Sequence, residues 1–231
     1  MPLRLDMTPD MKRSIVQAHD FYVEQVNKRV IAQFQDMEGD ADRYAKAEYE
    51  RLSARYGRED ADPADVAESA HDNAVGYYSL LHDLRQQVIL GAVAGPYHQW
   101  EKQLREFIVR ELAHEVKRDL ATEFAWSGNI GDVFGWLGQF GWDVRTQTFF
   151  PAIDACRLVV NVYKHGNGSA LAQLDKKYPK YLPDPIGKLM PSERLKLVSY
   201  EWLAATEEDF AEIANGLRAF WKNFPGQLTI E

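Results

Sequence analysis

Four polar side chains recur at helical spacing between residues 154 and 165 of this chain. On an α-helix, Arg157, Asn161 and His165 fall within an arc of roughly 80°. Asp154 projects into the same arc, beside an otherwise apolar stretch. Gly166 predicts the end of the helix, which places His165 in the last turn and within reach of solvent. Because imidazole titrates near neutral pH, His165 is a candidate functional group.

A structural interpretation of the same residues is also open. Lys164-His165-Gly166 is also an ordinary helix ending, since cations in the last turn suit the helix dipole. The guanidinium of Arg157 can pair with the carboxylate of Asp154 three residues upstream. The spacing alone therefore permits a working site or a set of internal contacts.

Composition restricts the class of protein. Of 231 residues, 45% are hydrophobic, which is enough for a sizeable core. The single cysteine, Cys156, excludes an internal disulfide, and we expect it to be a small buried apolar residue in a reducing compartment. The net charge of −8 weighs against a protein that coats nucleic acid non-specifically. Without an apolar leader or a run of membrane-span length, the sequence predicts a soluble cytoplasmic protein with no membrane contact.

Helix-start signals dominate the chain. Thr8-Pro9 and Asp62-Pro63 each place a capping residue before a proline, and Thr206 precedes Asp209 by three residues. We expect the helix bearing Arg157 at 144–165, with Pro151 as a kink or as its true start. The glycines and proline between 91 and 96 predict a turn or a kink between two helices. The predicted fold is an all-α bundle with a loop-rich C-terminal third. Its expected parts are a helical pair (1–60), a helical core (61–177), and a proline-rich loop with a final helix (178–231).

An arginine, a polar residue and a histidine near a helix end, inside an all-α domain, resemble the HEPN superfamily. Arg157, Asn161 and His165 carry that resemblance, although seven residues separate Arg157 from His165 where the family has four to six, and Leu158 follows the arginine. The resemblance implies a homodimeric, metal-independent endoribonuclease without a cofactor, or an RNA-binding or adaptor protein. It also implies a setting in phage defence or toxin–antitoxin systems, with an antitoxin or other protein partner.

The same resemblance implies roles for single residues. His165 would act as general base or acid, Arg157 would hold the scissile phosphate, and Asn161 would orient one of them. Cationic side chains that would bind the RNA are Lys164, Lys176 and Lys177. A loop anchored by tyrosines is an alternative for the basic stretch at 176–181.

Two further interpretations belong to other classes of protein. One is a non-catalytic helical interaction or adaptor module. The other is a dimetal carboxylate bundle, because Glu68-Ser-Ala-His71 and Glu111-Leu-Ala-His114 are both Glu-x-x-His pairs. The predicted turn lies about twenty residues from each pair, so the pairs would sit at a similar height on antiparallel helices. His98 and Glu101, just after that turn, are candidates to face the same cleft as His165.

Overall fold

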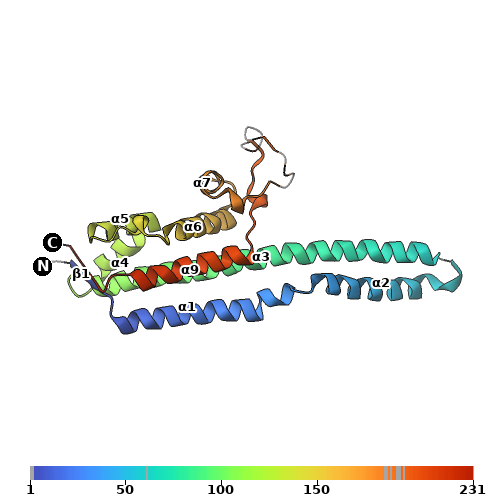
Figure 1. The fold of residues 1–231 in the computed structure, drawn as a ribbon, viewed down its shortest axis with the longest axis horizontal. Coiled ribbons are helices and arrows are strands. Elements are labelled where there is room, and N and C mark those ends of the chain that lie inside the picture. The colour runs from blue at the N-terminus through green and yellow to red at the C-terminus, as the bar shows by residue number, and fades with distance from the viewer. Residues whose placement is uncertain are drawn as a thin grey trace. The chain divides into compact units, whose positions relative to one another are not determined.

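The structure is a computed structural model that describes residues 3–60, 62–184, 187, 189–190, 194 and 196–230, with the side chains of 56–60 left aside. The chain forms two compact units, one made of residues 1–24 and 90–231 and the other of residues 25–89. Two helices, α1 (Pro9–Arg29) and α3 (Pro63–Leu112), contribute to both units. Apart from one two-stranded sheet, the described chain is helical, which confirms the predicted all-α class (Figure 1). The prolines at 185 and 191, which belong to the predicted proline-rich loop, lie outside the described residues.

The predicted caps are present at the helix starts. Thr8 Oγ1 accepts a hydrogen bond from the Met11 amide at 3.2 Å, and α1 begins at the next residue, Pro9. An Asp62 carboxylate oxygen accepts from the Ala64 amide at 2.9 Å, where α3 begins. At α9 (Glu207–Asn223) the capping box is reciprocal, because the hydroxyl of Thr206 and the carboxylate of Asp209 each accept from the other residue's amide.

Of the turn or kink predicted between residues 91 and 96, the turn is wrong, because α3 continues without interruption through Pro96. A proline inside a helix costs about 3 kcal/mol, so other interactions must compensate. Pro96 lies beside the buried side chains of Tyr97 and Trp100. At Gly95 the hydroxyl of Tyr22 from α1 approaches so closely that a Cβ atom would collide with it. Tertiary packing therefore outweighs the tendency of glycine and proline to end a helix. Gly95 lies where α1 and α3 approach each other closely.

In the larger unit, α9 packs against α6 (Phe150–His165) and α6 packs against α7 (Ser169–Lys177). Trp100, Phe220 and Phe224 belong to a cluster of aromatic rings, with the Trp100 and Phe220 centroids 5.0 Å apart. The glycine-rich stretch after residue 126 forms a short helix, α5 (Ile130–Gln139), which follows α4 (Arg118–Ser127). Single turns of 3-10 helix complete this unit at Val144–Thr146 (η2), Pro179–Tyr181 (η3) and Tyr200–Trp202 (η4).

The opposite side of α9 is tied to α1. An Asp20 carboxylate oxygen lies 2.6 Å from Nε of Arg218, and His19 Nε2 lies 2.9 Å from the Ala214 carbonyl oxygen. The strands β1 (Leu3–Asp6) and β2 (Gln227–Ile230) then pair antiparallel, with Leu3 opposite Ile230. Segments from the two ends of the sequence are thereby joined within one unit.

The smaller unit consists of the end of α1, the 3-10 turn η1 (Ile31–Phe34), α2 (Met37–Asp60) and the first part of α3. The rings of Tyr44 and Tyr77 stack at 4.5 Å, and the Asn73 amide donates to Glu48 at 3.0 Å. These pairs run in opposite directions along the two helices, so α2 and α3 form an antiparallel hairpin. Several apolar side chains of α3 stay exposed, including Leu80 and Leu84.

None of the helices that the structure describes combines the length and the apolar character that a bilayer crossing requires.

Candidate functional site

Helix α6 carries the four polar residues Asp154, Arg157, Asn161 and His165. Pro151 occupies the first turn of α6, so the helix starts at residue 150 and the predicted stretch from 144 to 149 is not part of it. The helix ends at Gly166, whose φ of 67° lies in the left-handed region that glycine tolerates. His165 is the last helical residue and is exposed, as predicted, while Cys156 is fully buried.

Asp154 is the centre of a hydrogen-bonded cluster on α6. One carboxylate oxygen accepts from Nη2 and Nε of Arg157, at 2.7 and 3.2 Å. The other accepts from the ammonium of Lys177 at 2.8 Å and from the hydroxyl of Tyr178 at 3.2 Å. The cluster connects α6 to the end of α7. The contact between Arg157 and Asp154 confirms the pairing that the structural interpretation predicts.

The cluster shifts the pKa of its members. Burial alone would raise the pKa of Asp154, but hydrogen bonds from Lys177 and Arg157 and their positive charges outweigh it and hold that pKa below its ordinary value. Burial, together with the neighbouring charge of Asp154, raises the pKa of Tyr178 to about 12. Asp154 is therefore ionised and Tyr178 neutral across the physiological pH range.

One face of α6 borders a cavity of about 370 Å³, which we call the α6 cavity. Arg157, Asn161 and Lys164 line it, whereas His165 does not. The opposite wall comes from α3 and the α4–α5 connection. The remaining lining residues are Tyr97, His98, Glu101, Lys102, Trp126, Asn129, Ile130 and Val160. The imidazole that lines the α6 cavity together with Arg157 and Asn161 is therefore that of His98, whereas the predicted His165 lies outside the lining.

The ionic balance in the α6 cavity favours anions. Glu101 is compensated by Arg105, whose Nη2 lies 2.6 Å from its carboxylate. The buried Arg105 also donates to the Ala125 carbonyl, and its guanidinium lies 5.5 Å from the Trp126 ring centroid. In the part of the chain that the structure describes, Lys102 and Lys164 have no ion pair. Two lysines therefore remain uncompensated on opposite walls.

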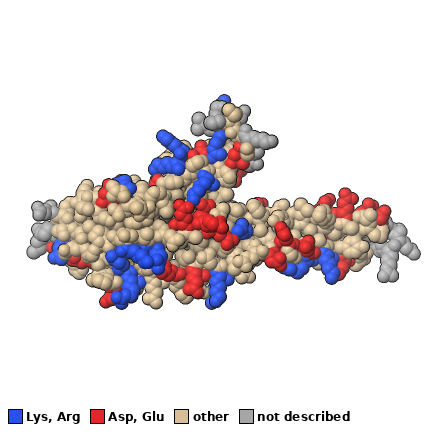
Figure 2. Space-filling view, in the orientation of Figure 1, with Lys and Arg blue, Asp and Glu red and all other residues tan. Residues whose placement is uncertain are grey.

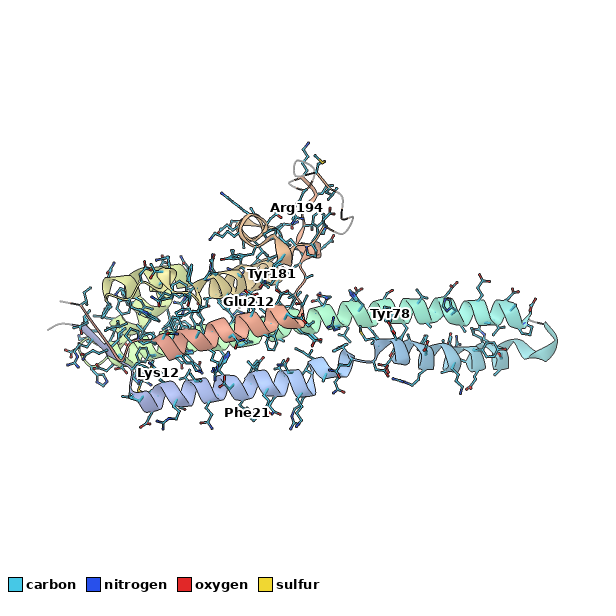
Figure 3. The ribbon with its side chains drawn as sticks, viewed as in Figure 1. Lys12, Phe21, Tyr78, Tyr181, Arg194 and Glu212 are labelled. Atoms are coloured by element: carbon cyan, nitrogen blue, oxygen red, sulfur yellow. The ribbon has the colours of Figure 1, made fainter. Side chains whose placement is uncertain are left out.

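The predicted RNA-binding lysines of the 176–181 stretch do not line the α6 cavity. Lys177 is bound to Asp154, and Lys180 pairs with Asp209 at 2.8 Å and with Glu212 at 2.6 Å. Tyr181 is buried near Asp209 and Glu212, at the start of α9. Figure 3 labels Tyr181 and Glu212. Lys176 is exposed. The contacts favour the alternative in which this stretch anchors a loop.

The two Glu-x-x-His pairs do not meet. Glu68 and Glu111 lie on one continuous helix, roughly twelve turns apart, instead of on antiparallel helices. Glu111 is buried and accepts a hydrogen bond from the Asp6 amide at 3.2 Å, while His71 and His114 are exposed. Within the described residues, no group of three or more His, Cys, Asp or Glu side chains is arranged to hold a metal ion.

Sequence reasoning named His98 and Glu101 but missed Lys102 and Trp126. The available signal was the repeat of polar residues on α3, where His98 and Lys102 stand four residues apart beside the Glu101–Arg105 pair. That signal does not reveal which helix faces these residues.

No protein-family model, no curated protein and no solved structure matches this chain. The HEPN resemblance accordingly stays a prediction that rests on Arg157, Asn161 and His165.

Proposed function

We propose that the protein binds RNA at the α6 cavity and cleaves a phosphodiester there without a metal ion. One observation supports this proposal above the others. The cavity brings together Arg157, Asn161 and Lys164 from α6 with His98 and Lys102 from α3. Phosphate-binding cations and a side chain able to transfer protons are thus combined in a space of nucleotide-sized dimensions.

The cationic groups suit a phosphate. Asp154 engages Nε and Nη2 of Arg157, which leaves the Nη1 donors of the guanidinium for another acceptor. Lys102 and Lys164 add two positive charges, and no carboxylate among the described residues pairs with either of them. Charge-assisted hydrogen bonds from such groups stabilise both a bound phosphate and the charge that develops on it during cleavage.

The chemistry requires a proton acceptor near the ribose. In this proposal the imidazole of His98 takes the proton of the 2′-hydroxyl, whose oxygen attacks the adjacent phosphorus. The bond from phosphorus to the 5′-oxygen breaks, and that oxygen takes a proton from solvent. The products are a 2′,3′-cyclic phosphate and a free 5′-hydroxyl. His98 here replaces His165 in the role that the family resemblance implies.

The decisive experiment uses a short fluorescein-labelled single-stranded RNA with EDTA present. The wild type should bind and cut it, and a 2′-deoxy version should bind without being cut. His98→Ala should abolish cleavage, whereas His165→Ala should retain it.

Binding is tested with charge-matched variants. Lys102→Ala/Lys164→Ala should weaken RNA binding by about tenfold to a hundredfold, since each of the two lost phosphate contacts is worth roughly 0.7–1.4 kcal/mol and tenfold corresponds to about 1.4 kcal/mol. The control Lys28→Ala/Lys46→Ala removes two exposed lysines of the other unit and should change little. A wild type that fails to bind RNA, or equal binding by the two double variants, would contradict the proposal.

A further inference from the structure

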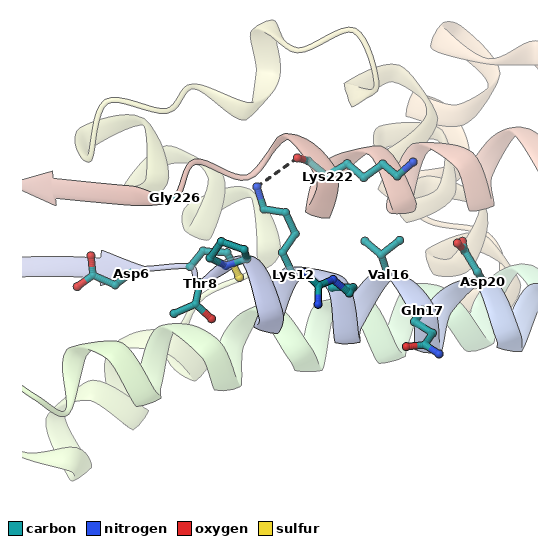
Figure 4. A pocket seen from close by; sticks show the side chains of 11 residues that line it. Asp6, Thr8, Lys12, Val16, Gln17, Asp20, Lys222 and Gly226 are labelled. Carbon is teal, nitrogen blue, oxygen red and sulfur yellow. Dashed lines mark hydrogen bonds between the residues drawn. The ribbon is translucent and has the colours of Figure 1, made fainter.

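A second cavity of about 920 Å³ lies where α1 begins and α9 ends, and we call it the α1–α9 groove (Figure 4). It shares no lining residue with the α6 cavity. Met7, Pro9 and Val16 supply apolar surface, while Lys12, Arg13 and Lys222 supply cations. The groove therefore combines an apolar lining with positive charge.

Lys12 is held in place across this groove. Its ammonium donates to the carbonyl oxygen of Phe224 at 2.6 Å and to that of Lys222 at 3.3 Å, as the dashed line to Lys222 shows in Figure 4. Those carbonyls belong to the last turn and the C-cap of α9. Because its partners are neutral carbonyls, the full charge of Lys12 remains beside the groove.

The acidic residues of the groove are already compensated. Asp20 makes two hydrogen bonds with Arg218, and this partner holds the pKa of Asp20 below its ordinary value. Asp6 pairs with Arg4 at 3.3 Å. Lys222 has no ion pair within the described part of the chain. Figure 2 shows Lys and Arg atoms gathered over the first turns of α1 and the end of α9.

We propose that the α1–α9 groove is a docking site for an acidic, amphipathic peptide segment of a partner protein. Such a segment supplies carboxylates for Lys12, Arg13 and Lys222 and apolar side chains for the lining. The positive surface stands out on a chain whose net charge is −8. A nucleic acid fits the groove less well, because its sugar–phosphate backbone gains little from apolar contacts and three cations supply only part of the charge neutralisation it needs. The proposal is independent of RNA binding at the α6 cavity.

The test uses a short fluorescein-labelled peptide built only of Leu and Glu, followed by fluorescence anisotropy. The wild type should bind it and should not bind the corresponding peptide of Leu and Lys. Arg13→Glu/Lys222→Glu should weaken binding by about tenfold or more, because reversed charges repel the carboxylates. Both side chains are exposed, and the Arg13–Asp10 pair contributes little to stability, so the variant should fold.

The matched control is Lys28→Glu/Lys46→Glu, which changes the net charge by the same amount at residues outside the groove. Equal loss of binding in the two double variants would show that only net charge matters and would overturn the proposal. Binding of the Leu/Lys peptide would overturn it as well. Displacement of the Leu/Glu peptide by a short polyuridine RNA at lower concentration would assign the groove to nucleic acid instead.

Discussion

The guanidinium of Arg157 donates to the carboxylate of Asp154 one turn earlier on α6, with Nη2 and Oδ1 2.7 Å apart. Arg157 also lines the α6 cavity. The structural and functional interpretations of this arginine are therefore compatible, because the ion pair fixes the side chain that would hold a phosphate. An unpaired arginine side chain would lose conformational entropy when it bound a phosphate. The ion pair with Asp154 already restricts Arg157, so most of that entropy loss does not occur on binding.

Replacing Asp154 should destabilise the protein in a pH-dependent way. We expect Asp154→Asn to lower the free energy of unfolding by about 2 kcal/mol near neutral pH, since it removes charged hydrogen bonds to Arg157 and Lys177. The folded pKa of Asp154 is lowered, so its contribution is complete above about pH 5 and is lost as the pH falls below about 4.

Urea denaturation of the wild type and Asp154→Asn across this pH range measures the effect. The difference between them should shrink as the pH falls, whereas the exposed-site control Glu123→Gln should show almost no difference. A constant difference down to pH 2.5, a value far below the ordinary carboxylate pKa, would contradict the account.

Lys12 should stabilise the end of α9. Lys12→Met removes the hydrogen bonds to the carbonyls of Lys222 and Phe224 and the favourable charge at a helix C-terminus. We expect a loss of about 1–2 kcal/mol, measured by chemical denaturation at low ionic strength. Lys46→Met, at an exposed position on α2, should have a far smaller effect, and an equal effect would refute this role of Lys12.

Gly216 should resist a substitution that normally favours helices. A Cβ atom at Gly216 of α9 would lie 2.6 Å from Cβ of Ala152 on α6. We expect Gly216→Ala to cost about 1–3 kcal/mol through overpacking, despite the better helix propensity of alanine. At the exposed Gly91 of α3 nothing lies within 4 Å of an added Cβ, so Gly91→Ala should stabilise by about 1 kcal/mol. Thermal unfolding of the two variants should shift in opposite directions.

His19 should make the α1–α9 contact sensitive to mild acid. Burial lowers the pKa of His19, against the opposing effects of its hydrogen bond to the Ala214 carbonyl and the charge of Asp20. Protonation therefore favours the unfolded chain, and stability should decline as the pH falls below about 6.5, the ordinary histidine pKa.

His19→Gln should flatten that decline between neutral pH and about pH 5. The exposed His82→Gln serves as the control and should leave the profile unchanged. Identical profiles for the wild type and His19→Gln would show that another group titrates in this range.

The sequence was sufficient for features that local chemistry decides. The caps at Thr8, Asp62 and Thr206 and the end of α6 at Gly166 depend on neighbouring residues, and all were predicted. The continuation of α3 through Pro96 was not, because it depends on tertiary packing around Tyr97 and Trp100. The α6 cavity was only partly predicted for the same reason: 58 residues of chain separate His98 from Arg157, and no local pattern fixes which helices face each other.

The single cysteine of the chain is fully buried on α6, and burial raises the pKa of its thiol far above the ordinary value. A thiol reagent can reach the Cys156 sulfur only when α6 separates from its neighbours. The rate of Cys156 labelling therefore reports how often the region that carries Arg157 and Asn161 opens, without any introduced probe. Comparing that rate with and without RNA would measure how tightly a bound ligand holds this part of the protein closed.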